Sequence, residues 1–228
     1  MIYAIADLHL SLGTDKPMDV FAGWSDYTKR LEANWKKLIT DDDTVVIAGD
    51  ISWAMKLNEC YEDFSFIHKL PGKKLFLKGN HDYWWGTKKK IDEYLSENGF
   101  DTINIIFNNA YTVEDKALCG TRGWISEPGG EKDAKVLARE VGRLDMSIAE
   151  AEKTGLEPIV FLHYPPVYDS VICDEILDVL KRHNIKHCYY GHLHGTFTHR
   201  HAITGEYDGI NFHLISCDYT GFFPVPVV

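Results

Sequence analysis

Short apolar runs, each followed closely by acidic, amide or histidine side chains, constrain this chain more than any other feature. Five runs are almost continuously apolar and too short for helices, as buried strands are. They are Ile2–Ala6, Thr44–Ala48, Lys74–Leu77, Pro158–Leu162 and Lys186–Tyr190. Helix-like segments alternate with them, at Tyr27–Ile39, Cys60–Leu70, Lys88–Glu97, Glu131–Lys153 and Asp174–His183. This alternation predicts an α/β fold with parallel strands joined by right-handed crossovers.

The last third of the chain has a different pattern. Two segments, Phe197–Ile203 and Phe212–Ser216, flank Gly205 and the Asp208-Gly209 pair, which favours a β-hairpin. A hairpin next to parallel strands indicates a mixed sheet or two stacked sheets. The chain has 228 residues and no repeat or linker-like stretch, so we expect a single domain over residues 1–228.

Composition excludes several classes of function. The formal net charge of −10 argues against a broad basic surface for duplex nucleic acid or anionic lipid. No run approaches the ~18–20 apolar residues of a membrane span, and the first residues lack the basic and apolar regions of a signal peptide. The five cysteines are scattered and form no CxxC pair, which favours reduced thiols. We therefore expect a cytoplasmic protein with no membrane partner.

Side chains that can bind metal ions follow most of the predicted strands. Ligands of open α/β sheets bind beyond the carboxyl ends of strands, so these side chains are candidates for one pocket. Carboxylate, amide and imidazole groups without a thiolate suit manganese, iron, zinc or cobalt. Seven ligands are too many for one tetrahedral ion and suit two adjacent ions with one bridging carboxylate. The candidates are Asp7, His9, Asp50, Asn80, His163, His192 and His194.

The spacing of these ligands also predicts how they point. Side chains two residues apart in an extended segment lie on the same face. Asp7 and His9 are therefore expected to share a face, and so are His192 and His194.

With these motifs the chain resembles the calcineurin-like metallophosphoesterases. The family's five motif blocks run from Asp7 to His194 as DLH, GD, GNHD, H and GHLH. The resemblance implies a four-layer α-β-β-α sandwich, with two mixed sheets flanked by helices. It also implies a binuclear centre of divalent or mixed-valence ions. Asp7, His9 and His194 would hold one ion. Asn80, His163 and His192 would hold the other, and Asp50 would bridge both.

Two departures from the family narrow the expected function. Its protein Ser/Thr phosphatases continue the second block with an acidic residue and an arginine and write the third as GNHE, whereas this chain has GDISWAM and GNHD. The missing phosphate-gripping arginine favours a bacterial-type phosphohydrolase. Arg122, in GTRGW, is either a substitute oxyanion clamp or a structural arginine.

Two further residues are candidate substrate contacts, Asn80 and Trp53. Trp53 belongs to a set of loop tryptophans that either stack on a leaving group or pack on one another. The long segment Leu10–Asp26, just after the first ligands, is a candidate lid.

The resemblance implies hydrolysis by a hydroxide that bridges the ions, because two ions about 3.5–4 Å apart lower the pKa of a shared water to near 7. His81 would stand beside the ions and donate a proton or hydrogen bond to the leaving oxygen. Asp82 would orient the His81 ring and keep it cationic. We therefore predict a metal-dependent phosphoric ester hydrolase that acts on a small phosphomonoester or phosphodiester.

Two alternatives stay open. A nuclease of the same fold is disfavoured by the acidic balance and the short chain. A non-catalytic metal-binding scaffold is disfavoured because His81 and Asp82 are both present.

Overall fold

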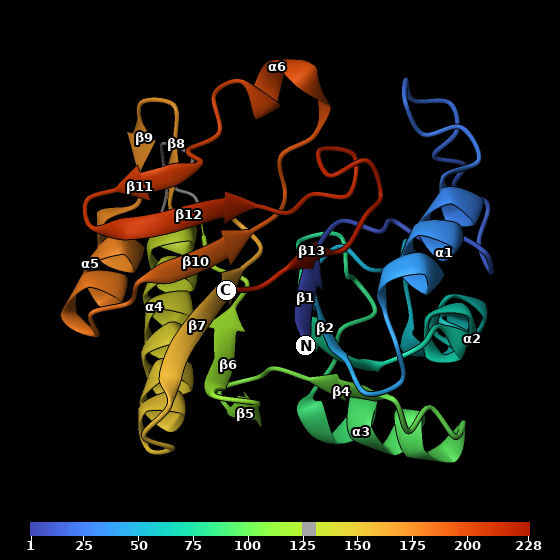
Figure 1. Ribbon diagram of the computed structural model, residues 1–228, viewed down its shortest axis with the longest axis horizontal. Coiled ribbons are helices and arrows are strands. Elements are labelled where there is room, and N and C mark those ends of the chain that lie inside the picture. The colour runs from blue at the N-terminus through green and yellow to red at the C-terminus, as the bar shows by residue number, and fades with distance from the viewer. Residues whose placement is uncertain (125–130) are drawn as a thin grey trace.

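The computed structural model describes residues 1–124 and 131–228. Two β-sheets lie in the middle of the molecule, with the helices of the first half of the chain on one side and the two longer helices of the second half on the other (Figure 1). The arrangement is therefore a four-layer α-β-β-α sandwich of mixed sheets, as predicted.

The first sheet has five strands in the order β13-β1-β2-β3-β4. Strands β1 to β4 run parallel to their neighbours, and β13 pairs antiparallel with β1. The strands are β1 (Ile2–Ile5), β2 (Thr44–Ala48), β3 (Lys73–Leu77), β4 (Ile103–Ile105) and β13 (Val225–Pro226). The helices of this half are α1 (Tyr27–Leu38), α2 (Tyr61–Lys69) and α3 (Lys88–Glu97), with a 3-10 turn at Leu57–Glu59.

The second sheet has six strands in the order β11-β12-β10-β7-β6-β5. Its four inner strands are parallel, and β5 and β11 pair antiparallel at the edges. The strands are β5 (Ala110–Val113), β6 (Lys116–Thr121), β7 (Glu157–Leu162), β10 (His187–Tyr190), β11 (Gly205–Tyr207) and β12 (Ile210–Leu214). The helices of this half are α4 (Glu131–Glu152), α5 (Asp174–Arg182) and α6 (Gly195–His199), and β8 (Val167–Tyr168) pairs with β9 (Val171–Ile172).

Three apolar clusters fill the spaces between the four layers. Trp35 of α1 and Phe64 of α2 pack with Phe76 on the outer face of the first sheet. A second cluster, which includes Val46 and Phe161, lies between the two sheets. A third joins α4 and α5 to the second sheet. Strands covered on both faces have to be apolar throughout, which explains why the runs were so visible in the sequence.

The five strands and five helices expected from the alternation are all present, each within one residue of its predicted ends. The expected strand at Phe197–Ile203 is wrong. Residues 195–199 form α6 instead, and the partner of β12 in the hairpin is β11. Local bonds stabilise the helix, since the Thr198 hydroxyl donates to the carbonyls of His194 and Gly195.

Two expectations from composition can be compared with the structure. All five cysteines are buried free thiols, as expected. Among the described residues, no helix has the length and apolar character that crossing a bilayer requires.

Candidate metal centre

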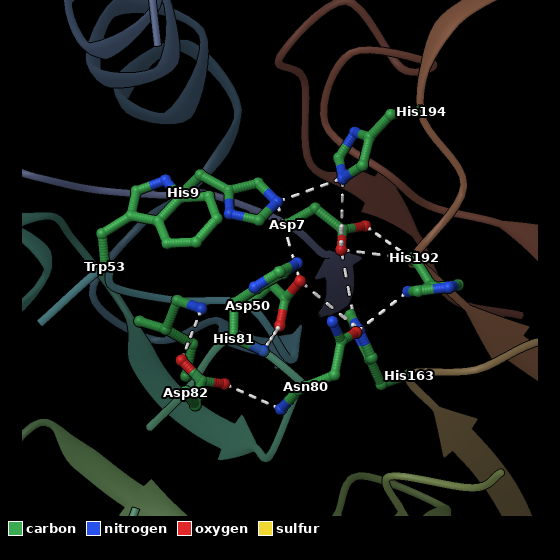
Figure 2. A network of polar contacts seen from close by, with 12 residues as sticks. Asp7, His9, Asp50, Trp53, Asn80, His81, Asp82, His163, His192 and His194 are labelled. Carbon is green, nitrogen blue, oxygen red and sulfur yellow. Dashed lines mark hydrogen bonds and ion pairs between the residues drawn. The ribbon is translucent and has the colours of Figure 1, made fainter. Parts of the chain in front are cut away.

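Every candidate metal ligand lies in a loop that follows the carboxyl end of a strand. Asp7 and His9 follow β1, Asp50 follows β2, and Asn80 follows β3 in the first sheet. His163 follows β7, and His192 and His194 follow β10 in the second sheet. Figure 2 shows the seven side chains converging from both sheets. The structure therefore brings together residues that span most of the chain.

One group of ligand atoms comes from Asp7, His9 and His194. Their candidate atoms all lie within 4.8 Å of one another. The two Nε2 atoms of His9 and His194 are 3.1 Å apart, and His194 Nε2 is 3.8 Å from Asp7 Oδ1. This is the set that the family resemblance assigns to the first ion.

A second group comes from Asn80, His163 and His192. Asn80 Oδ1 lies 2.6 Å from His163 Nε2 and 3.0 Å from His192 Nδ1. His163 Nδ1 lies 3.1 Å from the carbonyl oxygen of Ala48, which as its acceptor keeps the proton on Nδ1 and leaves Nε2 free to bind a cation.

The Asp50 carboxylate lies between the two groups. Its Oδ2 is 3.7 Å from His9 Nε2 and 3.5 Å from His163 Nε2, so one oxygen is near both sets. Its Oδ1 accepts a hydrogen bond of 2.7 Å from the backbone N–H of His81. This is the place that a bridging ligand has to occupy.

Four of the seven candidate ligands have left-handed backbone conformations. The φ angles are 63° at Asp7, 45° at His9, 50° at Asp50 and 72° at His192. Such conformations are uncommon for residues other than glycine, and they collect at functional sites. The left-handed turn at His192 also explains why the expectation that His192 and His194 point to the same face is wrong, since the rule holds only for an extended backbone. His192 turns toward Asn80 and His194 turns toward His9, so the two rings serve different groups.

Two glycines allow the chain to pack directly on the buried carboxylates. A Cβ at Gly79 would lie 2.1 Å from Asp50 Oδ1, and one at Gly191 would lie 2.5 Å from Asp7 Oδ2. The backbone N–H of His192 donates to both oxygens of Asp7, at 3.1 and 2.9 Å. The glycines of the GNHD and GHLH motifs therefore make room for ligands carried by other loops.

Two of the candidate histidine ligands have the neutral form that cation binding requires. Burial lowers the pKa of His163 to about 3, and burial together with the charge of His194 lowers the pKa of His9 well below its usual value. Both imidazoles are therefore neutral and able to act as ligands. Burial raises the pKa of the Asp7 and Asp50 carboxyls, because a charged carboxylate is unfavourable out of water, and the nearby positive charge of His194 offsets only part of this effect. Buried oxygen and nitrogen donors of this kind fit two transition-metal ions.

The comparison with family models agrees with this geometry. The model of the calcineurin-like phosphoesterases matches residues 1–196. The chain belongs to the calcineurin-like phosphoesterase family. Membership of this phosphoesterase family agrees with a metal-dependent hydrolase as the general class of protein, and the described residues include candidate metal-binding groups.

Individual relatives are more distant. An uncharacterised protein of Methanocaldococcus jannaschii is 29% identical over 98 residues, which cover 41% of this chain and about half, 52%, of the relative. A protein of unknown function from Aquifex aeolicus has a similar structure, with a TM-score of 0.53, 17% identity, and coverage of 99% of this chain and 94% of the other. The phosphopantetheinyl hydrolase of Mycobacterium tuberculosis has a TM-score of 0.51 and 16% identity, covering 94% and 88%. These two structures support the fold.

The Asp82 carboxylate does not contact the His81 ring, which was its expected partner. Its carboxylate is fully buried and accepts hydrogen bonds from the backbone N–H groups of Gly79, Ile51 and Ser52 and from the indole of Trp84. The expected pairing with the His81 ring is therefore wrong. Asp82 joins the GNHD loop to the loop that carries Asp50 (Figure 2), so its role is to hold the two loops together.

The His81 ring stands beside the two ligand groups. It lies against Trp53, with ring centres 4.6 Å apart, and 5.7 Å from the ring of His9. Its Nδ1 is 3.5 Å from the hydroxyl of Tyr83. Among the described residues, two clusters of acidic and histidine side chains could hold an ion, Asp7 with His9 and His194, and Asp7 with Asp50 and His163. His81 belongs to neither cluster, which fits a residue that stands beside the ions.

Trp53 and the segment Leu10–Asp26 form one wall of the site. The Trp53 ring stacks on His9 at 4.9 Å (Figure 2), and its indole N–H donates to Met18 Sδ at 3.3 Å. Trp24 is buried, with its ring centre 6.0 Å from that of His9 and 5.8 Å from that of His194. Part of the candidate lid is thus packed against the ligands.

Arg122 is paired within the protein. Its Nη2 lies 3.7 Å from Glu140 Oε1, and its guanidinium carbon is 5.0 Å from the centre of the Trp124 ring. Its backbone carbonyl accepts hydrogen bonds from His163 and Tyr164, at 3.1 and 2.9 Å. Arg122 therefore makes structural contacts, and its role as an oxyanion clamp stays a prediction.

Asp218 is a residue that the sequence interpretation missed. Its Oδ1 lies 3.0 Å from His194 Nδ1, and its Oδ2 accepts from the backbone N–H of Gly195 at 2.9 Å. Burial lowers the pKa of His194, but Asp218 and Asp7 outweigh it and raise that pKa to about 9. Asp218 fixes the ring so that Nε2 faces His9. It lies outside the five motifs, and only the fold brings it to His194.

Replacing Asp218 by asparagine is expected to weaken manganese binding about 10- to 100-fold, as is typical when the partner of a metal-binding histidine is lost. The asparagine Oδ1 can still accept from Gly195, so the loop keeps its conformation. Competition with a fluorescent chelator measures the affinity without reference to activity. Asp208→Asn, an exposed acid paired with Lys181, is the control. Equal affinity in the two variants would contradict the role of Asp218.

Proposed function

We propose that the chain is a binuclear phosphoesterase that hydrolyses a small phosphomonoester or phosphodiester. The observation that carries the proposal is the position of Asp50, whose single carboxylate lies near both ligand groups. Asp7, His9 and His194 would hold one ion, Asn80, His163 and His192 would hold the other, and Asp50 lies where it could contact both. When bound, the two ions supply an activated water and the positive charge that the phosphoryl group requires.

The residues around the ions have separate tasks in this proposal. Asp82, Gly79 and the His81 N–H fix the GNHD loop on Asp50, which sets the geometry of the second group. Trp53 limits access of water on the side of His9. The His81 ring, held beside the ligands by Trp53, donates a proton or hydrogen bond to the leaving oxygen.

Metal quantification together with an ester screen tests the proposal. Chelator-treated protein is reloaded with manganese, iron, zinc or cobalt and assayed with p-nitrophenyl phosphate and bis(p-nitrophenyl) phosphate. We expect about two ions per chain at saturation and turnover that requires both. Saturation at a single ion, or turnover that survives chelation, would exclude a binuclear mechanism.

Manganese is expected to stabilise the protein more at pH 8 than at pH 6. Burial raises the pKa of Asp7 and Asp50 above the ordinary aspartate value of 3.8, so the ion-free chain takes up protons when it folds. The stability of the ion-free protein is therefore highest below that value and falls as pH rises through the raised pKa values. A cation replaces these protons and competes with fewer of them at pH 8. Thermal melting with and without manganese measures the difference; an equal shift at both pH values would contradict it.

A further inference from the structure

A second hollow lies at the same edge of the sheets as the candidate metal centre. Like the metal ligands, its residues follow the carboxyl ends of strands, since Lys78 follows β3, Asn108 lies beyond β4 and Arg122 follows β6. Glu140 and Arg143 of α4 complete its lining. The backbone links the two sites: Lys78 directly precedes the GNHD loop, and the Arg122 carbonyl accepts a hydrogen bond from the backbone N–H of His163.

The hollow carries more positive than negative charge. Its single carboxylate, Glu140, is almost fully buried and lies 2.8 Å from Arg143 Nη1 and 3.7 Å from Arg122 Nη2. The hydroxyl of Thr121 also donates to Glu140, at 2.7 Å. Lys78 adds a third cation, with both arginines among its charged neighbours. The lining therefore has three cations and one carboxylate, and Asp82 is a further acidic neighbour of Lys78 outside the lining.

Some of the donors in this hollow have no acceptor. Lys78 makes no hydrogen bond or ion pair with any residue that the structure describes. Within the same described part, the Nε of Arg122 is the donor of this hollow that is both buried and without a hydrogen-bond partner. Buried donors are normally satisfied, and like charges held together out of water repel each other. An anion would supply both the acceptors and the counter-charge.

The size of the hollow limits what can enter it. Its interior measures about 20 Å³, which is about the room that one water occupies. One oxygen of a phosphoryl or carboxylate group fits this space while the rest of the ligand stays in the open. The hollow therefore suits the outer oxygen of a group that is attached to a larger molecule.

We propose that Lys78, Arg122 and Arg143 form an anion subsite for a second phosphate or carboxylate on the substrate whose ester lies at the metal centre. This rests on the proposed function and names its substrate class: a small phosphoester that carries another oxyanion a short distance from the scissile phosphate. Uncharged leaving groups, including nitrophenol, leave the subsite unused.

Binding of non-hydrolysable ligands to the manganese-loaded protein tests the subsite. Methylphosphonate carries one oxyanion, whereas methylenebisphosphonate and phosphonoacetate add a phosphoryl and a carboxylate group, and calorimetry gives each affinity. The ligand ratio is the affinity for a two-anion ligand divided by the affinity for methylphosphonate. In Lys78→Met we expect this ratio to fall about 10-fold, because charge-assisted hydrogen bonds are lost. The affinity for methylphosphonate itself stays within about twofold. If the affinity for methylenebisphosphonate falls further, the subsite prefers a phosphoryl group; if the affinity for phosphonoacetate falls further, it prefers a carboxylate.

Lys73→Met is the matched control, because Lys73 is an exposed lysine at the opposite end of β3. Lys78→Gln, which keeps a polar side chain, is expected to show the same fall in the ligand ratio as Lys78→Met. An unchanged ligand ratio in both Lys78 variants overturns the subsite. The readout is independent of turnover: hydrolysis of simple esters with an unchanged ratio refutes the subsite alone, and a fallen ratio without hydrolysis of any ester refutes the phosphoesterase alone.

Discussion

Replacing Asp50 by asparagine is expected to lower turnover roughly 1,000-fold and to leave at most one tightly bound ion per chain. The substitution keeps the shape of the side chain, and its carbonyl oxygen can still accept from the His81 N–H. The amide nitrogen then occupies the position of Oδ2, near His9 and His163, where it cannot bind a cation. Loss of several kcal/mol of charge stabilisation corresponds to about this factor, at about 1.4 kcal/mol for each tenfold.

Elemental analysis and the rate with p-nitrophenyl phosphate check this prediction. Asp43→Asn is a matched control, because Asp43 is a buried acid at the other end of β2, where it pairs with the N-terminal amine at 2.7 Å. Burial raises the pKa of Asp50, so the ion-free asparagine variant is also expected to melt at a higher temperature than the ion-free parent at pH 8. Two ions bound at parental affinity would show that Asp50 is not the bridge.

Replacing His81 by alanine is expected to keep both ions and to lower kcat about 100- to 1,000-fold for an ester with a poor leaving group. The His81 ring contacts Trp53 and lies beside the ligands, while its backbone N–H, which alanine retains, fixes Asp50. The loss follows from the missing proton donor. It is therefore expected to be much smaller for p-nitrophenyl phosphate, because nitrophenolate leaves readily without a proton.

A pair of assays separates this role from metal binding. Rates with p-nitrophenyl phosphate and an alkyl phosphate are compared at saturating manganese, with the ion content measured on the same samples. His68→Ala removes a histidine of α2 that lies 3.0 Å from Thr102 Oγ1 and serves as the control. A loss of ions in His81→Ala would make this residue a ligand, and equal rate losses for the two esters would remove its role as an acid.

The sheets and the ligands were predictable from sequence because one physical constraint produces both signals. A strand buried on both faces is apolar along its length, so its end is marked by the first polar residue. In this fold that polar residue is also a ligand or its neighbour, as at Asp7, Asp50 and His163. The order of motifs therefore indicated which loops meet before any contact was known.

The partners of the ligands were not predictable in the same way. Asp82 and His81 are adjacent in sequence, yet their side chains serve different neighbours because the turn after Asn80 sends them apart. Asp218 reaches His194 across 24 positions. The directions of His192 and His194 depend on a left-handed turn, and alternation along a strand does not apply where the backbone leaves the extended conformation.

The left-handed turns at Asp7, His9, Asp50 and His192 also indicate which substitutions would accumulate if the metal centre were no longer under selection. Each turn costs free energy for a residue with a side chain, on the order of 1 kcal/mol, and glycine relieves that cost. A descendant that no longer used its ions would gain stability from glycine at any of these positions. In a relative with an otherwise similar sequence, glycine at one of these positions would indicate that the metal-dependent activity has been lost.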